Sequence, residues 1–162
     1  MMLSLIPKPQ HLQLLQGDIQ FSAPLQLWGI NGAEVMLDRL PNLFGELFHP
    51  SSTGSNAQLR LEIDPDLRDD VGAEGYRLNI TTQGATISSA ESAGLFYGLQ
   101  TFKQLLPPDP AGEVILPCLV ITDQPRFEWR GFMLDEARHF FGKQTVKRVL
   151  DWLAFFKINR FH

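Results

Sequence analysis

Polar and apolar residues alternate along several short segments, which is the pattern of strands buried on one face. Residues 59–63 follow it clearly. Residues 76–81 and 85–89 repeat it on either side of Thr82-Gln83-Gly84, so we expect a hairpin at this turn. The same reasoning predicts further strands at residues 19–21, 25–28 and 114–121.

Helical spacing replaces alternation in two segments. Residues 92–106 align Leu95, Leu99, Phe102 and Leu106 on one stripe, and Gly94 and Gly98 share another face. Glycine weakens a helix, so this pair indicates backbone that lies close against a sheet. Residues 33–48 form a second helical pattern, which Pro41 should kink or restart. This pattern therefore predicts that residues 1–122 form an α+β domain, a sheet with helices on one face.

A different order begins at Asp123. A strand is predicted at Gly131–Asp135, where consecutive apolar residues suggest that both faces are covered. A helix at about 144–156 and a strand at 158–162 follow, and the helix should bury the stripe of Val146, Val149, Leu150 and Leu153. Parallel strands need neighbours on both sides, so we expect residues 123–162 to be the front end of something longer.

Composition and charge narrow the function. With 162 residues and 44% hydrophobic residues the chain can bury a core, and a net charge of −4 gives no electrostatic attraction to nucleic acid or an anionic membrane. Cys118 is the only cysteine, which excludes an intrachain disulfide, and His11 and His49 have no companions at metal-ligand spacing, so no metal is expected. No signal peptide is visible, so we expect a cytoplasmic protein if the N-terminus is native.

Candidate chemistry lies at the carboxyl end of strand 131–135. In parallel β/α folds the loops after the strands build the active site, and this loop carries Asp135, Glu136, Arg138 and His139. Arg138 could donate to vicinal hydroxyls or a carboxylate, with Asp135 or His139 holding it in place. The alternative is a structural Arg–Asp pair at the corner.

The other basic residues near this strand suggest structural roles. Arg126 and Arg130 precede the strand and lie at its opposite end, where we expect them to serve stability. His162 belongs to a strand that has barely begun, and a core or hydrogen-bonding role is its default interpretation.

Two motif blocks resemble a known family. The run Pro125–Asp135, the segment Ala137–Phe141 and the end Asn159–His162 look like the start of the catalytic barrel of β-N-acetylhexosaminidases, glycoside hydrolase family 20. Upstream, Glu74–Leu78 and Ala93–Thr101 look like the α+β domain that precedes this barrel. The resemblance covers most of the chain from Glu74 onward and implies an incomplete TIM barrel after the α+β domain.

This resemblance implies hydrolysis of terminal N-acetylglucosamine or N-acetylgalactosamine with retention, in which the substrate's own acetamido oxygen attacks. Arg138 would bind hydroxyls of the sugar, supported by Asp135, His139 and His162. The catalytic Asp–Glu pair of the family would lie beyond His162. We therefore expect no cofactor, an amino-sugar substrate for the parent enzyme, and no activity for an N-terminal fragment of 162 residues.

Two other interpretations remain open. The chain could be a free-standing, non-catalytic module with a structural or sugar-binding role. The tail, residues 123–162, could also pair in a homodimer, because exposed strand edges and apolar patches recruit other chains.

Overall fold

The structure, a computed structural model, describes residues 4–108 and 112–162. It divides into two units, Met1–Gln124 and Pro125–His162. The first unit holds the large sheet, and the second holds the candidate site.

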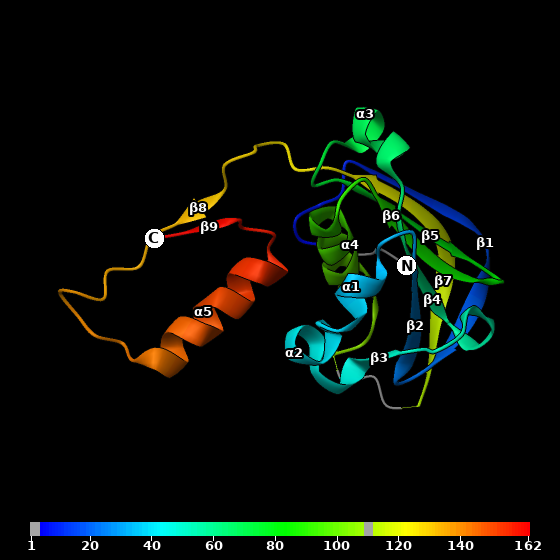
Figure 1. The fold of residues 1–162 in the computed structure, drawn as a ribbon, viewed down its shortest axis with the longest axis horizontal. Helices are drawn as coiled ribbons and strands as arrows, with labels where there is room; N and C mark the ends of the chain where they lie inside the picture. Colours follow the sequence, from blue (N-terminus) through cyan, green and yellow to red (C-terminus); the bar gives the residue numbers. More distant parts are fainter. Residues whose placement is uncertain (1–3, 109–111) are drawn as a thin grey trace. The chain divides into compact units, whose positions relative to one another are not determined.

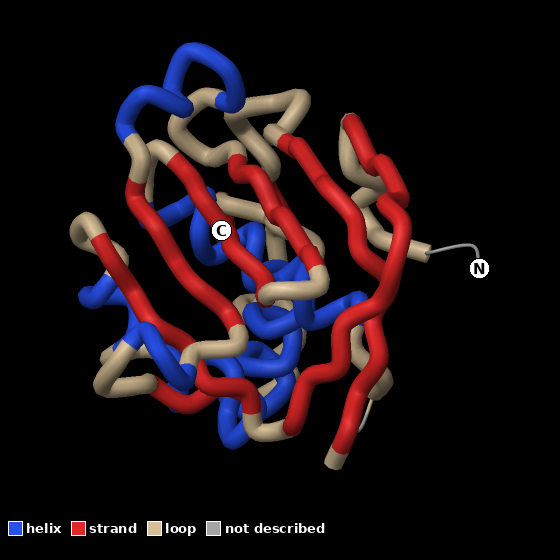
Figure 2. The backbone as a smooth tube through the Cα atoms, turned by 90° about the vertical axis from the view of Figure 1, so that its right-hand side faces the viewer, coloured by secondary structure: helices blue, strands red, loops and turns tan. Residues whose placement is uncertain are grey.

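A mixed sheet of seven strands forms the first unit, in the order β1-β7-β5-β6-β4-β2-β3. The pairs β2 with β3, β2 with β4, and β4 with β6 are parallel, whereas the pairs that involve β1, β5 and β7 are antiparallel. Figure 2 shows these strands side by side. Their bounds are β1 His11–Ser22, β2 Leu25–Ile30, β3 Phe48–Pro50, β4 Leu59–Ile63, β5 Tyr76–Thr81, β6 Gly84–Ser89 and β7 Glu113–Asp123.

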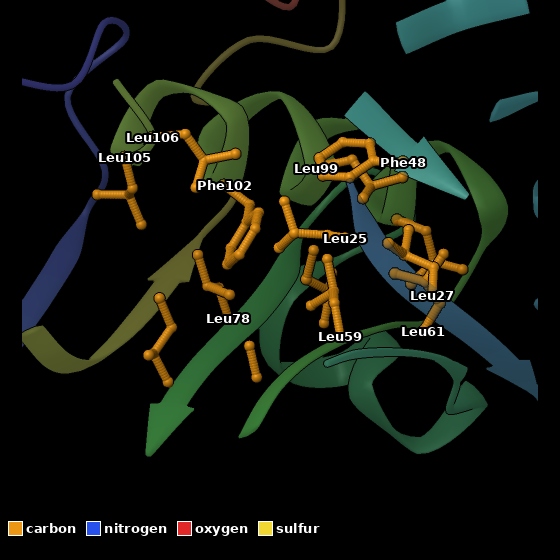
Figure 3. Close-up of a cluster of buried hydrophobic side chains, with 14 of the residues drawn as sticks. Leu25, Leu27, Phe48, Leu59, Leu61, Leu78, Leu99, Phe102, Leu105 and Leu106 are labelled. Carbon is orange, nitrogen blue, oxygen red and sulfur yellow. The ribbon is translucent and has the colours of Figure 1, made fainter. Parts of the chain in front are cut away.

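Helices α1, α2 and α4 lie against one face of this sheet (Figure 1). The core fills the space between α4 and the strands, and Leu25, Leu59, Leu61, Leu78 and Leu99 are fully buried in it (Figure 3). Fully burying each such side chain contributes about 1.5–3 kcal/mol. The helices are α1 Glu34–Leu37, α2 Leu40–Phe44, α3 Arg68–Val71 and α4 Ser92–Leu105, with single 3₁₀ turns at Gly45–Leu47, Gly54–Asn56 and Pro65–Leu67.

Two backbone expectations for these helices are confirmed. The helical segment breaks before Pro41, and α2 restarts with this proline in its first turn. The glycine face of α4 does contact the sheet. A Cβ on Gly98 would lie 2.5 Å from Cγ2 of Ile87, so a larger residue there would force the packing to shift.

The second unit consists of β8 (Gly131–Phe132), α5 (Lys143–Phe155) and β9 (Arg160–Phe161), with β8 and β9 parallel. Three predictions for this unit are wrong. The first strand is shorter than 131–135, and the second is shorter than 158–162. None of the described residues of α5 is buried, with Leu150 still 42% exposed. Two strands of two residues each present too little surface to cover a helix of thirteen.

Within residues 4–108 and 112–162, no helix is long and apolar enough to cross a membrane.

Candidate functional site

The two short parallel strands of the second unit end together. Beyond the formal strands, the N–H of His162 donates to the carbonyl of Phe132 at 3.0 Å, and the N–H of Leu134 donates to the carbonyl of His162 at 2.8 Å. The ladder thus brings His162 beside Leu134, one residue before Asp135. Parallel strands direct their carboxyl ends to the same edge, so Asp135 and His162 enter the candidate site from neighbouring strands.

Asp135 and Arg138 form the centre of the loop that follows β8. Oδ1 of Asp135 accepts hydrogen bonds from the N–H groups of Ala137 and Arg138, both at 3.0 Å. Oδ2 accepts one from Nε of Arg138, which makes the contact an ion pair as well. The structural Arg–Asp pair that the sequence suggested as an alternative is therefore present.

This pair leaves the arginine head accessible. Asp135 binds Arg138 through Nε, and the Arg138 side chain is 90% exposed, so its outer guanidinium nitrogens can donate to a ligand. A guanidinium held at Nε keeps its plane while offering a fork of N–H groups. The structural interpretation and the ligand-binding interpretation are thus compatible, because different atoms of Arg138 serve each.

The same hydrogen bonds keep Asp135 ionised. They lower the pKa of its carboxyl group, the largest cause being the backbone N–H of Arg138 and the second its side chain. A general acid needs a raised pKa, so Asp135 is unsuited to that role although Glu136 stands next to it in sequence. Asp135 instead orients Arg138.

Glu136 closes the loop at its other end, a contact that no sequence pattern predicted. Its Oε2 accepts a hydrogen bond from the N–H of Phe141 at 3.1 Å. The ring of Phe141 in turn meets the ring of His139 edge-on, with 4.6 Å between centroids. His139 thus has an aromatic contact, whereas Arg138 is held by a carboxylate.

Arg130 lies at the opposite end of β8 and has different partners. Its Nε and one outer nitrogen donate to the carbonyls of Lys157 at 2.7 Å and Phe127 at 2.6 Å. Its own N–H donates to Oδ1 of Asn159 at 3.0 Å, and Nδ2 of Asn159 reaches the carbonyl of Glu128 at 2.8 Å. These contacts tie the segment before β8 to the segment before β9, which is a structural role.

A metal site is the other kind of site in question for the described residues. No group of three or more His, Cys, Asp or Glu side chains in residues 4–108 and 112–162 could hold a metal ion. His11, His49 and Cys118 lie in the first unit, and the Cys118 thiol is buried.

Comparison with known proteins identifies the family of both units. Residues 2–124 match the family model described as "Glycosyl hydrolase family 20, domain 2", and residues 127–162 match "Glycosyl hydrolase family 20, catalytic domain". A beta-hexosaminidase of Vibrio furnissii is 34% identical over 165 residues, which cover 99% of this chain and 26% of the relative. One of Akkermansia muciniphila is 46% identical over 92 residues, covering 55% of this chain and 18% of the relative.

Solved structures of the same family have this fold. An N-acetyl-beta-hexosaminidase of Streptomyces plicatus matches with a TM-score of 0.82 and 34% identity, covering 98% of this chain and 33% of its own. An exo beta-N-acetylglucosaminidase of Vibrio harveyi, solved with N-acetylglucosamine, matches with a TM-score of 0.78 and 29% identity, covering 98% of this chain and 25% of its own. The predicted fold class, an α+β unit followed by part of a TIM barrel, is confirmed.

The extent of these matches sets the scope of the conclusion. The chain spans 18% to 33% of the length of the four proteins named above. Within the chain the first family model alone covers residues 2–124 of 162. This chain therefore belongs to glycoside hydrolase family 20.

Proposed function

We propose that this chain is part of a β-N-acetylhexosaminidase that removes terminal N-acetylglucosamine or N-acetylgalactosamine from the non-reducing end of a glycan. The observation that carries the proposal is the corner after β8, where Asp135 holds Nε of Arg138 and leaves the rest of the guanidinium exposed. The family match and the N-acetylglucosamine bound in the Vibrio harveyi relative support the substrate class.

In this proposal Arg138 binds the substrate and does not take part in bond cleavage. Its outer nitrogens donate hydrogen bonds to hydroxyls of the terminal sugar, and Asp135 fixes the plane from which they donate. His139 and His162 support Arg138 in this proposal, from the same loop and from the neighbouring strand end. Their arrangement orients the sugar ring, which is the part of catalysis that positioning supplies.

The bond-breaking step follows the substrate-assisted route of the family. The acetamido oxygen attacks the anomeric carbon, and the configuration is retained after water opens the cyclic intermediate. The Asp–Glu pair that orients the acetamido group and transfers protons is proposed to lie outside these 162 residues. The 162 residues alone then lack a proton donor for the leaving group.

The proposal also divides the chain into two domains. Residues 1–122 form the α+β domain, and residues 123–162 begin the catalytic barrel. The division of the structure after Gln124, and two family models that match 2–124 and 127–162, support a boundary in this region.

We also propose that two copies of the chain associate through the tail, residues 123–162. Trp129, Met133, Phe140 and Trp152 are all more than 60% exposed in the second unit, which is unusual for large apolar side chains in one small unit. Pairing of two tails would remove some of this surface from water.

The substrate class can be tested through the acetamido group. A chain that continues from His162 through a complete catalytic domain should hydrolyse a chromogenic N-acetyl-β-glucosaminide. It should not hydrolyse the matching β-glucoside, which lacks the attacking oxygen. Equal rates on both substrates would contradict the substrate-assisted mechanism.

A further inference from the structure

Glu136 is the residue in the candidate loop to which the proposed function assigns no role. Its Oε2 accepts a hydrogen bond from the N–H of Phe141, five residues on. Its Oε1 is buried and has no hydrogen-bond partner among the described residues. A half-buried carboxylate with one unpaired oxygen is unfavourable, by about 1–3 kcal/mol for the unpaired group. The hydrogen bond from the Phe141 N–H offsets part of this cost.

The bond to Phe141 completes a closed loop. Asp135 binds the N–H groups of Ala137 and Arg138 at the start of the loop, and Glu136 binds Phe141 at its end. Closing a short segment at both ends removes backbone freedom that would otherwise have to be lost on ligand binding. Arg138 lies between the two closures.

The Arg138 side chain cannot substitute for the hydrogen bond between Glu136 and the Phe141 N–H. The ion pair of Arg138 with Asp135 spans three residues and restrains only the first half of the loop. Without Glu136, the ring contact between His139 and Phe141 is the remaining contact of this segment within the described part of the chain. The direction in which Arg138 leaves the loop then depends on contacts with Asp135 alone, which are two backbone hydrogen bonds and an exposed ion pair of the kind that contributes little.

We infer that Glu136 is a positioning residue, which closes the loop through Phe141 and thereby sets Arg138 for sugar binding. The inference rests on the proposed function, because it acts through Arg138. Glu136 itself does not contact the sugar in this account.

One test follows the loop without catalysis, in the 162-residue chain, through the pKa of Asp135 measured by NMR. Glu136→Ala removes both a negative charge and the closure, whereas Glu136→Gln removes the charge and keeps an acceptor for Phe141. Loss of a neighbouring negative charge lowers the pKa of Asp135, and loss of the loop hydrogen bonds raises it. We expect the pKa to rise in Glu136→Ala and not in Glu136→Gln.

Glu128→Ala is the matched control, because it removes the same charge from an exposed position of the same unit. It should leave the pKa of Asp135 unchanged. A fall in the pKa of Asp135 in both Glu136 variants would show that only the charge of Glu136 acts, and would overturn the inference. Chemical-shift dispersion like that of the unchanged chain identifies variants that have kept their fold.

A second test measures catalysis in a chain that carries a complete catalytic domain. Glu136→Ala should lower kcat/KM about 10-fold to 100-fold, mostly through KM, as expected when a binding group is displaced by about 1 Å. Glu136→Gln should recover it to within about threefold. On an Arg138→Ala background Glu136→Ala should have no further effect, since the two residues act as one.

The outcomes separate the inference from the function on which it rests. If Arg138→Ala weakens catalysis and Glu136→Ala does not, Glu136 has no positioning role. An additive effect of the two changes would contradict the inference as well. If Arg138→Ala is fully active, the proposed sugar-binding role of Arg138 fails, and the kinetic role of Glu136 fails with it.

Discussion

Arg138 and Arg130 are the same residue type at the two ends of one strand, and their contacts differ. The Arg130 guanidinium donates hydrogen bonds to the main-chain carbonyls of Lys157 and Phe127. Arg138 uses Nε on Asp135 and keeps an exposed head. At the scale of single residues, the proposal that Arg138 binds substrate and Arg130 does not rests on the exposed donors of Arg138.

Replacing these two arginines should therefore have different effects in a chain with a complete catalytic domain. Arg138→Ala should lower kcat/KM by about 2–3 kcal/mol, the value of a charged hydrogen bond, with little change in stability. Arg130→Ala should mainly lower the free energy of unfolding. Arg126 is an exposed arginine beside Phe127, and Arg126→Ala is therefore the control for loss of one positive charge. Steady-state kinetics and thermal unfolding of the three variants test this, and equal kinetic losses with intact stability would refute it.

A buried polar cluster in the first unit gives a second contrast. The Tyr76 hydroxyl lies 2.6 Å from Oγ1 of Thr101 and donates to Oδ2 of Asp123 at 3.0 Å. Oδ1 of Asp123 accepts from the N–H of Gln10 at 3.2 Å. The cluster joins β5, α4, the end of β7 and the segment before β1. Burial, and next the charge of Asp123, raise the pKa of Tyr76 far above its ordinary value.

Tyr76→Phe should lower the free energy of unfolding by about 1–3 kcal/mol at neutral pH, because two buried groups lose the hydroxyl that they share. The raised pKa means that the stability from Tyr76 is present below about pH 10, the unfolded value, and is lost above it. The difference between the two proteins should thus shrink above about pH 10. Urea unfolding at several pH values measures it, and a difference that grows with pH would contradict the account.

Helix α4 decides how closely the first unit packs at the scale of elements. A Cβ on Gly94 would lie 2.1 Å from the carbonyl oxygen of Gly75, and one on Gly98 would lie 2.5 Å from Cγ2 of Ile87. The neighbour of Gly94 is backbone, whereas the neighbour of Gly98 is a side-chain methyl. Backbone cannot move aside without disturbing the sheet.

Both alanine variants should destabilise the protein, although alanine favours a helix by about 1 kcal/mol over glycine. Overpacking costs about 1–3 kcal/mol, and we expect Gly94→Ala to be worse than Gly98→Ala. Ser92→Ala, at an exposed position of the same helix, should change stability by no more than about 0.5 kcal/mol. Denaturant unfolding ranks the three. A stabilised Gly94→Ala would show that the helix does not contact the sheet there.

Sequence periodicity identified the strands with one buried face and helix α5, and it missed most of an exposed strand. Strands β4 and β5 have the predicted bounds, because their residues alternate between core and surface. Most of β1 escaped prediction, since residues 11–18 are exposed and show no alternation. The stripe on α5 was read correctly as a helix but wrongly as a buried one, because burial depends on a partner surface and not on periodicity.

The candidate site was predictable only in part for the same reason. The order of strand and loop directed attention to Asp135, Arg138 and His139, because position after a parallel strand is visible in sequence. The hydrogen bond that Glu136 accepts from the Phe141 N–H is not visible in the sequence, since many acidic loop residues make no such contact. Whether His162 takes part in binding stays a prediction.

Unequal coverage of apolar side chains distinguishes the two units at the scale of the whole molecule. The first unit buries its large side chains between sheet and helices (Figure 3). In the second unit, by contrast, Trp129 is 72% exposed and Phe140 is 77% exposed. Surface of this kind favours association with another chain.

Light scattering should therefore detect a dimer of the 162-residue chain and a monomer of a version that ends at Gln124. The shorter version keeps all of β7, including the contacts of Asp123. Monomers in both cases would show that the tail does not drive association. A dimer in both cases would assign association to the first unit instead.

The division of the catalytic machinery is the central claim, and hydrolysis tests it most directly. The 162-residue chain and a chain that continues through a complete catalytic domain are incubated with a chromogenic N-acetyl-β-glucosaminide at equal concentration. The account predicts turnover by the longer chain alone, because it proposes that the proton donor lies outside the 162 residues. Turnover by the 162-residue chain that co-purifies with it and survives a contaminant check would contradict the account.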